Sequence, residues 1–113
     1  MNIPAWVQHF PGAITVCDPS GIILAMNDKS AENYSADGGI RLVGTNMLDC
    51  HPEPARSKLK TMLDAQQTNV YTIEKHGVKK LIYQTPWFED GQYGGFLELS
   101  VEIPFEMPHF IRD

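Results

Sequence analysis

The last third of the chain has the clearest hydrophobic pattern. Apolar side chains alternate with others from residue 95 to 103, which is the period of a strand with two different faces. One face carries Leu97, Leu99, Val101 and Ile103, and the other carries Phe96, Glu98, Ser100 and Glu102. Two further strand-like runs, 70–75 and 80–88, precede this one, and turn residues at 76–77 and 89–91 separate the three. Pro86 predicts an edge or a bulge in the second run.

Two shorter strands are predicted near the start. Residues 13–18 and 22–26 are largely apolar, and Asp18-Pro19-Ser20-Gly21 forms a four-residue turn between them. Asn27 or Asp28 can accept a hydrogen bond from the first turn of a short following helix.

Two other stretches have helical spacing. Apolar residues of segment 2–10 recur at i, i+3, i+4 and i+7, as in an amphipathic helix. A longer helix is predicted for 53–67, because prolines precede it and an apolar stripe follows. Residues 44–50, between the short and the long helix, contain a turn and one short helical piece.

The order of these elements predicts the architecture. Consecutive strands with a block of helices between them favour an α+β fold, with a five-stranded antiparallel sheet and helices on one face. We divide the chain into an N-terminal amphipathic helix (1–12), a main domain (13–103) and a proline-broken apolar tail (104–113).

Composition narrows the function. The 113 residues carry a formal net charge of −5, and no Lys/Arg stripe is present, so nucleic acid and anionic membranes are not expected as partners. No apolar run approaches the ~20 residues of a membrane span, and no signal peptide is evident. Two cysteines are too few for a disulfide framework, which favours the cytoplasm.

Few residues suggest chemistry. Cys50-His51 could be redox-active or bind a metal, but adjacent side chains rarely reach one ion, so structural roles are expected for both. Asp49 and Glu53 are expected to cap the long helix. The sequence shows no nucleophile–base pair, phosphate-binding loop or metal motif, so we do not expect an enzyme.

Several segments, in this order, resemble the PAS domain family of sensory modules. They are 11–14, 17–22, 26–27, 90–95 and 97–103. Asp-Cys-His-Pro at 49–52 most resembles the PAS subgroup that is often fused to hemerythrin-like domains. The resemblance implies a sensory or regulatory domain rather than a catalyst.

Two cofactor signatures of that family are missing at the matching positions. Photosensory flavin-binding members have a reactive cysteine directly after Gly-x-Asn, where this chain has Met47, and Cys50 comes three residues too late. Haem-binding members place a histidine ligand in the long helix, where this chain has Leu59. His51 is an alternative haem ligand, and the identity of any cofactor stays unknown.

The resemblance implies that a small molecule would bind between sheet and helices. The candidate pocket residues are Met26, Met47, His51, Leu59, Met62, Leu63, Tyr71, Ile73, Tyr83, Leu97 and Leu99. Flexible methionines suit an adaptable pocket, although the same residues could form a filled core. Tyr71, Tyr83, Gln84 and Thr85 could contact a ligand or pair across strands.

A second group of residues is expected to contact another protein. It comprises Ile3, Trp6, Val7, Phe10, Phe96, Phe105 and Phe110. The first helix is expected on the sheet face opposite the other helices, which we assign to the face of Phe96. We therefore expect a homodimer that signals to an unidentified partner protein. The alternative is a ligand-free dimerisation or interaction module.

Overall fold

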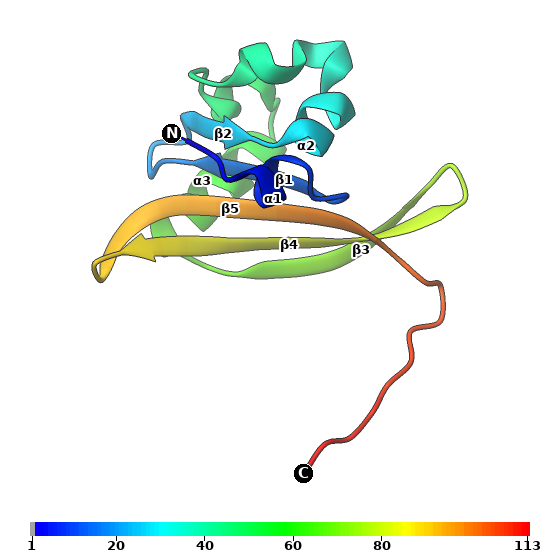
Figure 1. The fold of residues 1–113 in the computed structure, drawn as a ribbon. Helices are drawn as coiled ribbons and strands as arrows, with labels where there is room; N and C mark the ends of the chain where they lie inside the picture. Colours follow the sequence, from blue (N-terminus) through cyan, green and yellow to red (C-terminus); the bar gives the residue numbers. More distant parts are fainter. Residues whose placement is uncertain (1) are drawn as a thin grey trace.

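The computed structural model describes residues 2–113 and contains one five-stranded antiparallel sheet. The strand order is β2-β1-β5-β4-β3, so the last strand lies at the centre between the first and fourth (Figure 1). The strands are β1 (Ala13–Cys17), β2 (Ile23–Met26), β3 (Asn69–Lys75), β4 (Val78–Glu89) and β5 (Gln92–Ile103). The predicted α+β class with an antiparallel sheet is confirmed.

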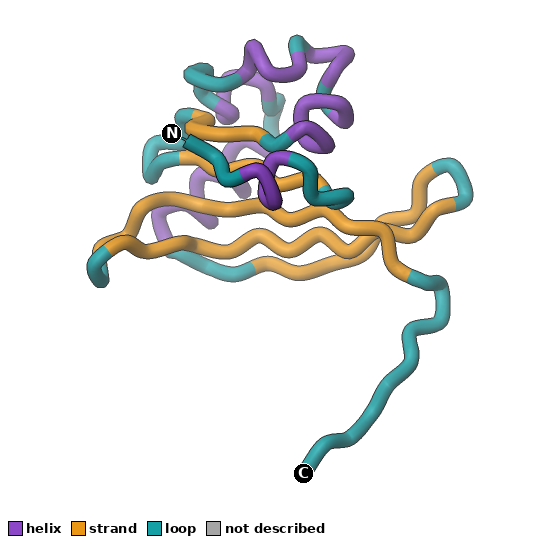
Figure 2. Tube along the Cα trace, in the orientation of Figure 1, coloured by secondary structure: helices purple, strands orange, loops and turns teal. Residues whose placement is uncertain are grey.

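Helices connect β2 to β3 and cover one face of the sheet (Figure 2). The α-helices are α1 (Ala5–Gln8), α2 (Asp28–Asn33) and α3 (Ala55–Ala65). Three single-turn 3-10 helices lie between α2 and α3, namely η1 (Ser35–Asp37), η2 (Gly39–Leu42) and η3 (Met47–Cys50). Within residues 2–113, no helix is long and apolar enough to cross a membrane.

The side chain of Asn27 links α1, β1 and α2 through hydrogen bonds. Its side-chain oxygen accepts hydrogen bonds from the backbone N–H groups of Ser30 (3.1 Å) and Ile14 (2.9 Å), which caps α2 and fixes it to β1. Its amide nitrogen donates to the carbonyls of Gly12 (2.9 Å) and Val7 (3.0 Å). Asn27 is 1% exposed, and every polar group of its side chain has a hydrogen-bond partner. Its burial therefore leaves no polar group unsatisfied.

Two predictions about proline segments need correction or refinement. The first helix spans only Ala5–Gln8 rather than 2–10, because Pro4 is its N-cap and Pro11 disfavours helical backbone at Phe10. Pro86 lies in β4 beyond the end of its pairing with β3, which stops at Gln84, so at Pro86 only β5 is a neighbour and the position is locally an edge. The pairing with β5 also shifts register between Trp87 and Phe88, so both a local edge and a nearby bulge are found.

The centre of the sheet depends on a close backbone approach at Gly95. A Cβ atom built there would lie 1.9 Å from the Cys17 carbonyl oxygen, and the residue has a φ of +128°. Trp87 lies against neighbouring Gly94, and its indole N–H donates to the same Cys17 carbonyl at 3.2 Å. Around this point, four buried side chains form the core cluster: Cys17, Leu48, Leu63 and Phe96.

Candidate functional site

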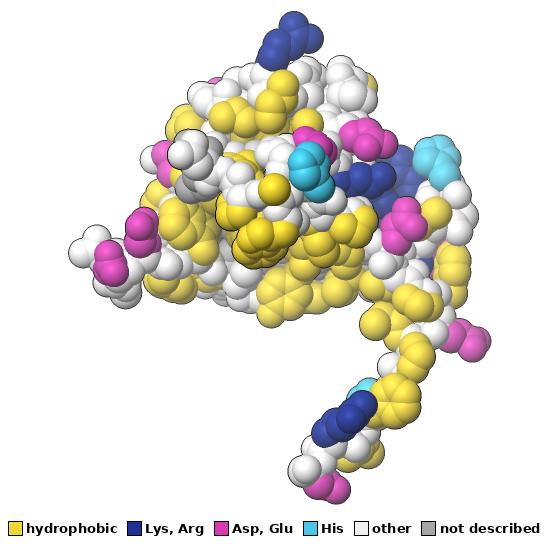
Figure 3. Space-filling view, in the orientation of Figure 1, with side chains coloured by type: hydrophobic (Ala, Val, Ile, Leu, Met, Phe, Trp, Pro, Cys, Tyr) yellow, Lys and Arg dark blue, Asp and Glu magenta, His cyan; other side chains and the backbone are white. Residues whose placement is uncertain are grey.

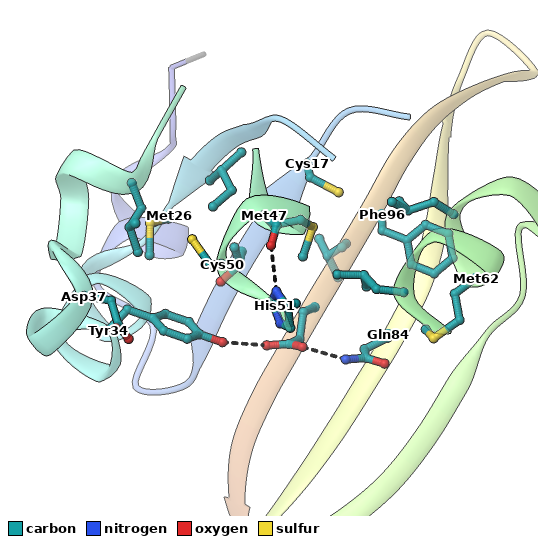
Figure 4. A pocket seen from close by; sticks show the side chains of 17 residues that line it. Cys17, Met26, Tyr34, Asp37, Met47, Cys50, His51, Met62, Gln84 and Phe96 are labelled. Atoms are coloured by element: carbon teal, nitrogen blue, oxygen red, sulfur yellow. Dashed lines mark hydrogen bonds between the residues drawn. The ribbon is translucent and has the colours of Figure 1, made fainter. Parts of the chain in front are cut away.

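A cavity of about 250 Å³ lies between the sheet and the helical layer. The outer wall comes from the helical layer and includes Met47, Cys50, His51, Leu59, Met62 and Leu63 from η3, the following residue and α3. The sheet supplies the opposite wall from β1, β2, β4 and β5 (Figure 4). An apolar cavity of ~150 Å³ holds benzene, so this space suits a compact molecule of about ten non-hydrogen atoms.

The cavity has an apolar interior and a more polar mouth. Met26, Leu63 and Phe96 are buried and line its inner part. Tyr34 and Asp37 come from the end of α2 and from η1. Asp37 is exposed, and Tyr34 is 38% exposed as a residue although its hydroxyl end is desolvated. A ligand with an apolar body and one polar end would match this division.

A chain of hydrogen bonds crosses three strands and ends at a carboxylate that lines the cavity. Asn69 on β3 donates to the Gln84 side-chain oxygen at 3.1 Å, which directs the Gln84 amide N–H₂ toward Glu98. Gln84 then donates to Glu98 Oε2 at 2.7 Å, and the Tyr34 hydroxyl donates to Glu98 Oε1 at 3.4 Å (Figure 4). Thr15, opposite Glu98 on β1, is instead bonded to Ser30 at 2.5 Å.

Tyr34 remains a neutral hydrogen-bond donor across the physiological pH range. Burial is the main reason that its pKa is raised, and the negative charge of Glu98 raises it further. Burial and the charge of Glu98 also raise the pKa of Tyr71. The Cys17 thiol in the cavity wall has a raised pKa as well, chiefly because it is buried, so this cysteine is a poor nucleophile.

A hydrogen bond to the backbone determines which ring nitrogen of His51 carries the hydrogen. Its Nδ1 lies 2.6 Å from the Met47 carbonyl oxygen, which can only accept, so Nδ1 carries the hydrogen. In the neutral ring, Nε2 then holds a lone pair that a donor could use. The pair Cys50-His51 therefore belongs to the cavity wall, with His51 anchored to η3.

The charged side chains around the cavity are all acidic. Asp37 and Glu98 border it, and none of the described residues that line it is Lys or Arg. Across residues 2–113, no three His, Cys, Asp or Glu side chains converge in a way that could hold a metal ion. The cavity therefore offers negative charge, an imidazole and aromatic rings to a ligand.

Seven of the predicted pocket residues line the cavity. They are Met26, Met47, His51, Leu59, Met62, Leu63 and Leu97. The methionines come from β2, η3 and α3, so elements far apart in sequence meet at one space.

The other four predicted pocket residues lie elsewhere. Tyr83 and Leu99 are directly paired and project from the opposite face of the sheet, because they alternate with Gln84 and Glu98. Tyr71 and Ile73 lie on edge strand β3, where they are 42% and 38% exposed and do not reach the cavity. Their positions correct the assignment made from sequence.

The prediction for Phe96 needs the same correction. It is 7% exposed and packs in the core cluster on the cavity side, so it is not available to a partner protein. Alternation in a strand gives two faces but does not say which one meets the helices. The outer face therefore carries Leu99 and Val101 rather than Phe96, whereas Leu97 still borders the cavity.

The outer face and the tail expose many apolar side chains. Phe10 and Val101 both lie against Gly12, so the segment after α1 sits at the edge of this face. Trp6 is 78% exposed, and the tail extends away from the sheet (Figure 1). Figure 3 shows hydrophobic side chains gathered around α1 and along the tail. Of the predicted contact residues, Phe105 and Phe110 are exposed in the tail, whereas Ile3 and Val7 are partly buried.

Sequence reasoning missed most of the polar residues of the site. Gln84 was weighed as a ligand contact, but Thr15, Tyr34, Asp37 and Glu98 were not. Glu98 alternates with apolar residues in β5, so it resembles a solvent-facing charge. The one available signal was its spacing of two residues from Phe96, which puts both side chains on one face.

Comparison with known proteins finds similarity in structure but not in sequence. No protein-family model matches the sequence, and no curated protein is significantly similar to it. Solved structures do match. The PAS domain of an HTR-like protein from Haloarcula marismortui has a TM-score of 0.61 and 16% identity, covering 88% of this chain and 87% of that one. The PAS domain of BvgS from Bordetella pertussis has a TM-score of 0.60 and 18% identity, covering 87% and 81%.

A third match is a dual PAS-haem oxygen sensor from Vibrio cholerae, with a TM-score of 0.55 and 20% identity, covering 82% of this chain and 95% of that one. This chain therefore has the PAS fold, and the resemblance inferred from the sequence is confirmed at that level. The third neighbour is itself an oxygen sensor, and the likeness of this chain to all three concerns the fold. The resemblance to the subgroup fused to hemerythrin-like domains stays a prediction.

The cavity residues do not fit the two cofactors considered from sequence. Haem propionates and flavin phosphates are anionic, whereas the charged side chains bordering this cavity are Asp37 and Glu98. Its volume of about 250 Å³ is also below the ~300–1,000 Å³ common for larger ligands. His51 offers Nε2, but the surroundings would not neutralise a haem.

Proposed function

We propose that this chain is a sensory or regulatory domain that binds a small molecule in the cavity and signals in trans through protein–protein contacts. The observation that carries the proposal is the cavity itself, which has an apolar interior and oriented polar groups at Glu98, Tyr34 and His51. A domain with a purely structural core would be expected to fill this space with side chains.

The bonds at Glu98 supply a physical route for the signal. A ligand that takes up an acceptor position on Glu98 would compete with Tyr34 at the end of α2 and with Gln84 on β4. Losing either hydrogen bond would change how the helical layer is held against the sheet, and so shift the populations of their arrangements. We propose that the outer sheet face and α1 transmit this change to a second copy of the chain and then to a signalling partner.

A ligand-free dimerisation or interaction module is the second candidate. The exposure of Trp6 (78%), Phe105 (54%) and Phe110 (68%) favours it, because side chains of this size are normally covered. In that case the cavity would be a packing defect without a ligand. We further propose that the domain is not an enzyme and that it works in the cytoplasm, where its two free cysteines, Cys17 and Cys50, would stay reduced.

The test is native mass spectrometry on freshly purified protein, paired with a denatured measurement. We expect a homodimer with an excess mass that disappears on denaturation. The control is a variant with a filled cavity, Leu59→Trp, which should keep the dimer and lose the excess mass. Dimers that carry no adduct in several purifications would favour the interaction module.

A further inference from the structure

We propose that the cavity is selective for a compact organic cation, such as an amine attached to an apolar or aromatic body. This inference rests on the proposed function and adds the class of ligand. It starts from the charges around the cavity, where Asp37 and Glu98 border the space and no described lining residue is Lys or Arg.

Glu98 has acceptor positions to spare. An ionised carboxylate has about four lone-pair positions, and two protein donors, Gln84 and Tyr34, bond to Glu98. The bond from Tyr34 is long at 3.4 Å, so a ligand ammonium group could replace it or add to it. Asn69 holds the Gln84 amide in place, which keeps the carboxylate oriented before a ligand arrives.

The rest of the wall also suits a cation with an apolar body. The rings of Tyr34 and Phe96 present π-faces or edges to the cavity, and aromatic faces attract ammonium groups. Three methionines line the same space and adapt to an apolar body. An anionic ligand would face two carboxylates with no basic lining side chain to offset them.

The test uses three probes of similar size on the full chain: 2-phenylethylamine, 2-phenylethanol and phenylacetate. Binding is measured by calorimetry or by ligand-observed NMR at neutral pH. We expect the amine to bind about tenfold more tightly than the alcohol, since a hydrogen bond to a charged group is worth that much or more, and the acid to bind most weakly.

Two variants then assign the preference to one residue. Glu98→Gln keeps the shape of the side chain and removes its charge, so it should weaken the amine about tenfold and leave the alcohol unchanged. Glu102→Gln removes the same charge from the same face of β5 outside the cavity, and it should change neither probe. A thermal melt shows whether each variant is folded. If Glu98→Gln unfolds, the ranking of the three probes on the wild-type protein decides.

Three results would overturn the proposal. Equal or tighter binding of the alcohol or the acid would overturn the ligand class and leave a small-molecule pocket. An amine preference that survives in a folded Glu98→Gln variant would also overturn it. No binding of any probe up to about 10 mM, where even very weak ligands register, would overturn it too. If the native spectra then also lack an adduct, the proposed function fails with it.

Discussion

The two faces of the sheet differ in what lies against them. The inner face carries Phe96, Glu98 and Gln84, and the helical layer covers it while leaving a cavity. The outer face carries Leu99 and Tyr83, and the chain itself covers it only in part, leaving Tyr83 40% exposed. The same strands therefore place polar, oriented groups toward the cavity and apolar groups toward an uncovered surface.

This difference would let one sheet bind a ligand on one face and contact a partner on the other. The inner side contains the cavity proposed for a small molecule, and the outer side offers the exposed apolar surface proposed for a protein partner. Because alternate residues of one strand serve the two sides, a change at Glu98 is one residue away from Leu97 and Leu99. Substitutions that act on one face or on the junction between β1 and β5 should show whether the two tasks are separable.

The largest effect is expected at Gly95, where β5 passes β1. Gly95→Ala places a methyl group on the Cys17 carbonyl and forces alanine into a left-handed backbone, so we expect a loss of about 3 kcal/mol or more in the free energy of unfolding. Gly77→Ala is the matched control. It also has a positive φ, of +76°, but open space around it, so it should cost only about 1 kcal/mol. Urea unfolding measures both, and equal losses would contradict a role for the close approach.

The same truncation on each face gives the next largest effect. Leu63→Ala removes a side chain that is 2% exposed in the core cluster and should cost about 3 kcal/mol. Leu99→Ala on the half-buried outer face should cost about 1 kcal/mol at low protein concentration. If the cost of Leu99→Ala rises with protein concentration, a second copy covers the outer face. Equal costs at every concentration would show that the two faces do not differ energetically.

A charge on α1, which precedes the segment at the edge of the outer face, tests whether α1 lies in a dimer interface. Trp6→Asp should weaken self-association about 100-fold, because large aromatic side chains often dominate interfaces and a carboxylate there would be buried. Ile111→Asp, which changes an even more exposed tail residue, should leave the dimer intact. Light scattering across a concentration series measures both. An unchanged dimer with Trp6→Asp would remove α1 from the interface.

The sequence predicted the strands, the turns and the PAS fold because each depends on local periodicity and on glycine or proline at fixed places. Asn27 as a cap and the closing turn before Gln92 are examples. The identity of the inner face was not predictable in this way, since Phe96 and Leu97 are equally apolar. Tyr34 and Asp37 were missed for a different reason. They reach the cavity only because short 3-10 turns fold back over the sheet, and no periodic pattern encodes that path.

The smallest expected effect concerns pH and the Tyr34–Glu98 contact. Burial and the carboxylate raise the pKa of Tyr34 in the folded state, so as pH rises above about 10 the unfolded chain loses this proton first. Stability is therefore complete below that pH and falls above it. Because Tyr34 is 38% exposed, solvent screening limits its share to about 0.5 kcal/mol per pH unit.

Tyr34→Phe should make the alkaline decline in stability shallower, and Glu98→Gln should do so partly, because it keeps the phenol but removes the charge that raises its pKa. Urea unfolding between about pH 8 and pH 11 measures the slope. The two variants share one contact, so their effects should be less than additive, and the double variant should exceed Tyr34→Phe only by the share of Tyr71, whose pKa Glu98 also raises. If both leave the slope unchanged, Glu98 does not act on Tyr34. The Glu98 carboxylate would then not interact with Tyr34, and ligand binding at Glu98 could not affect α2 through this contact.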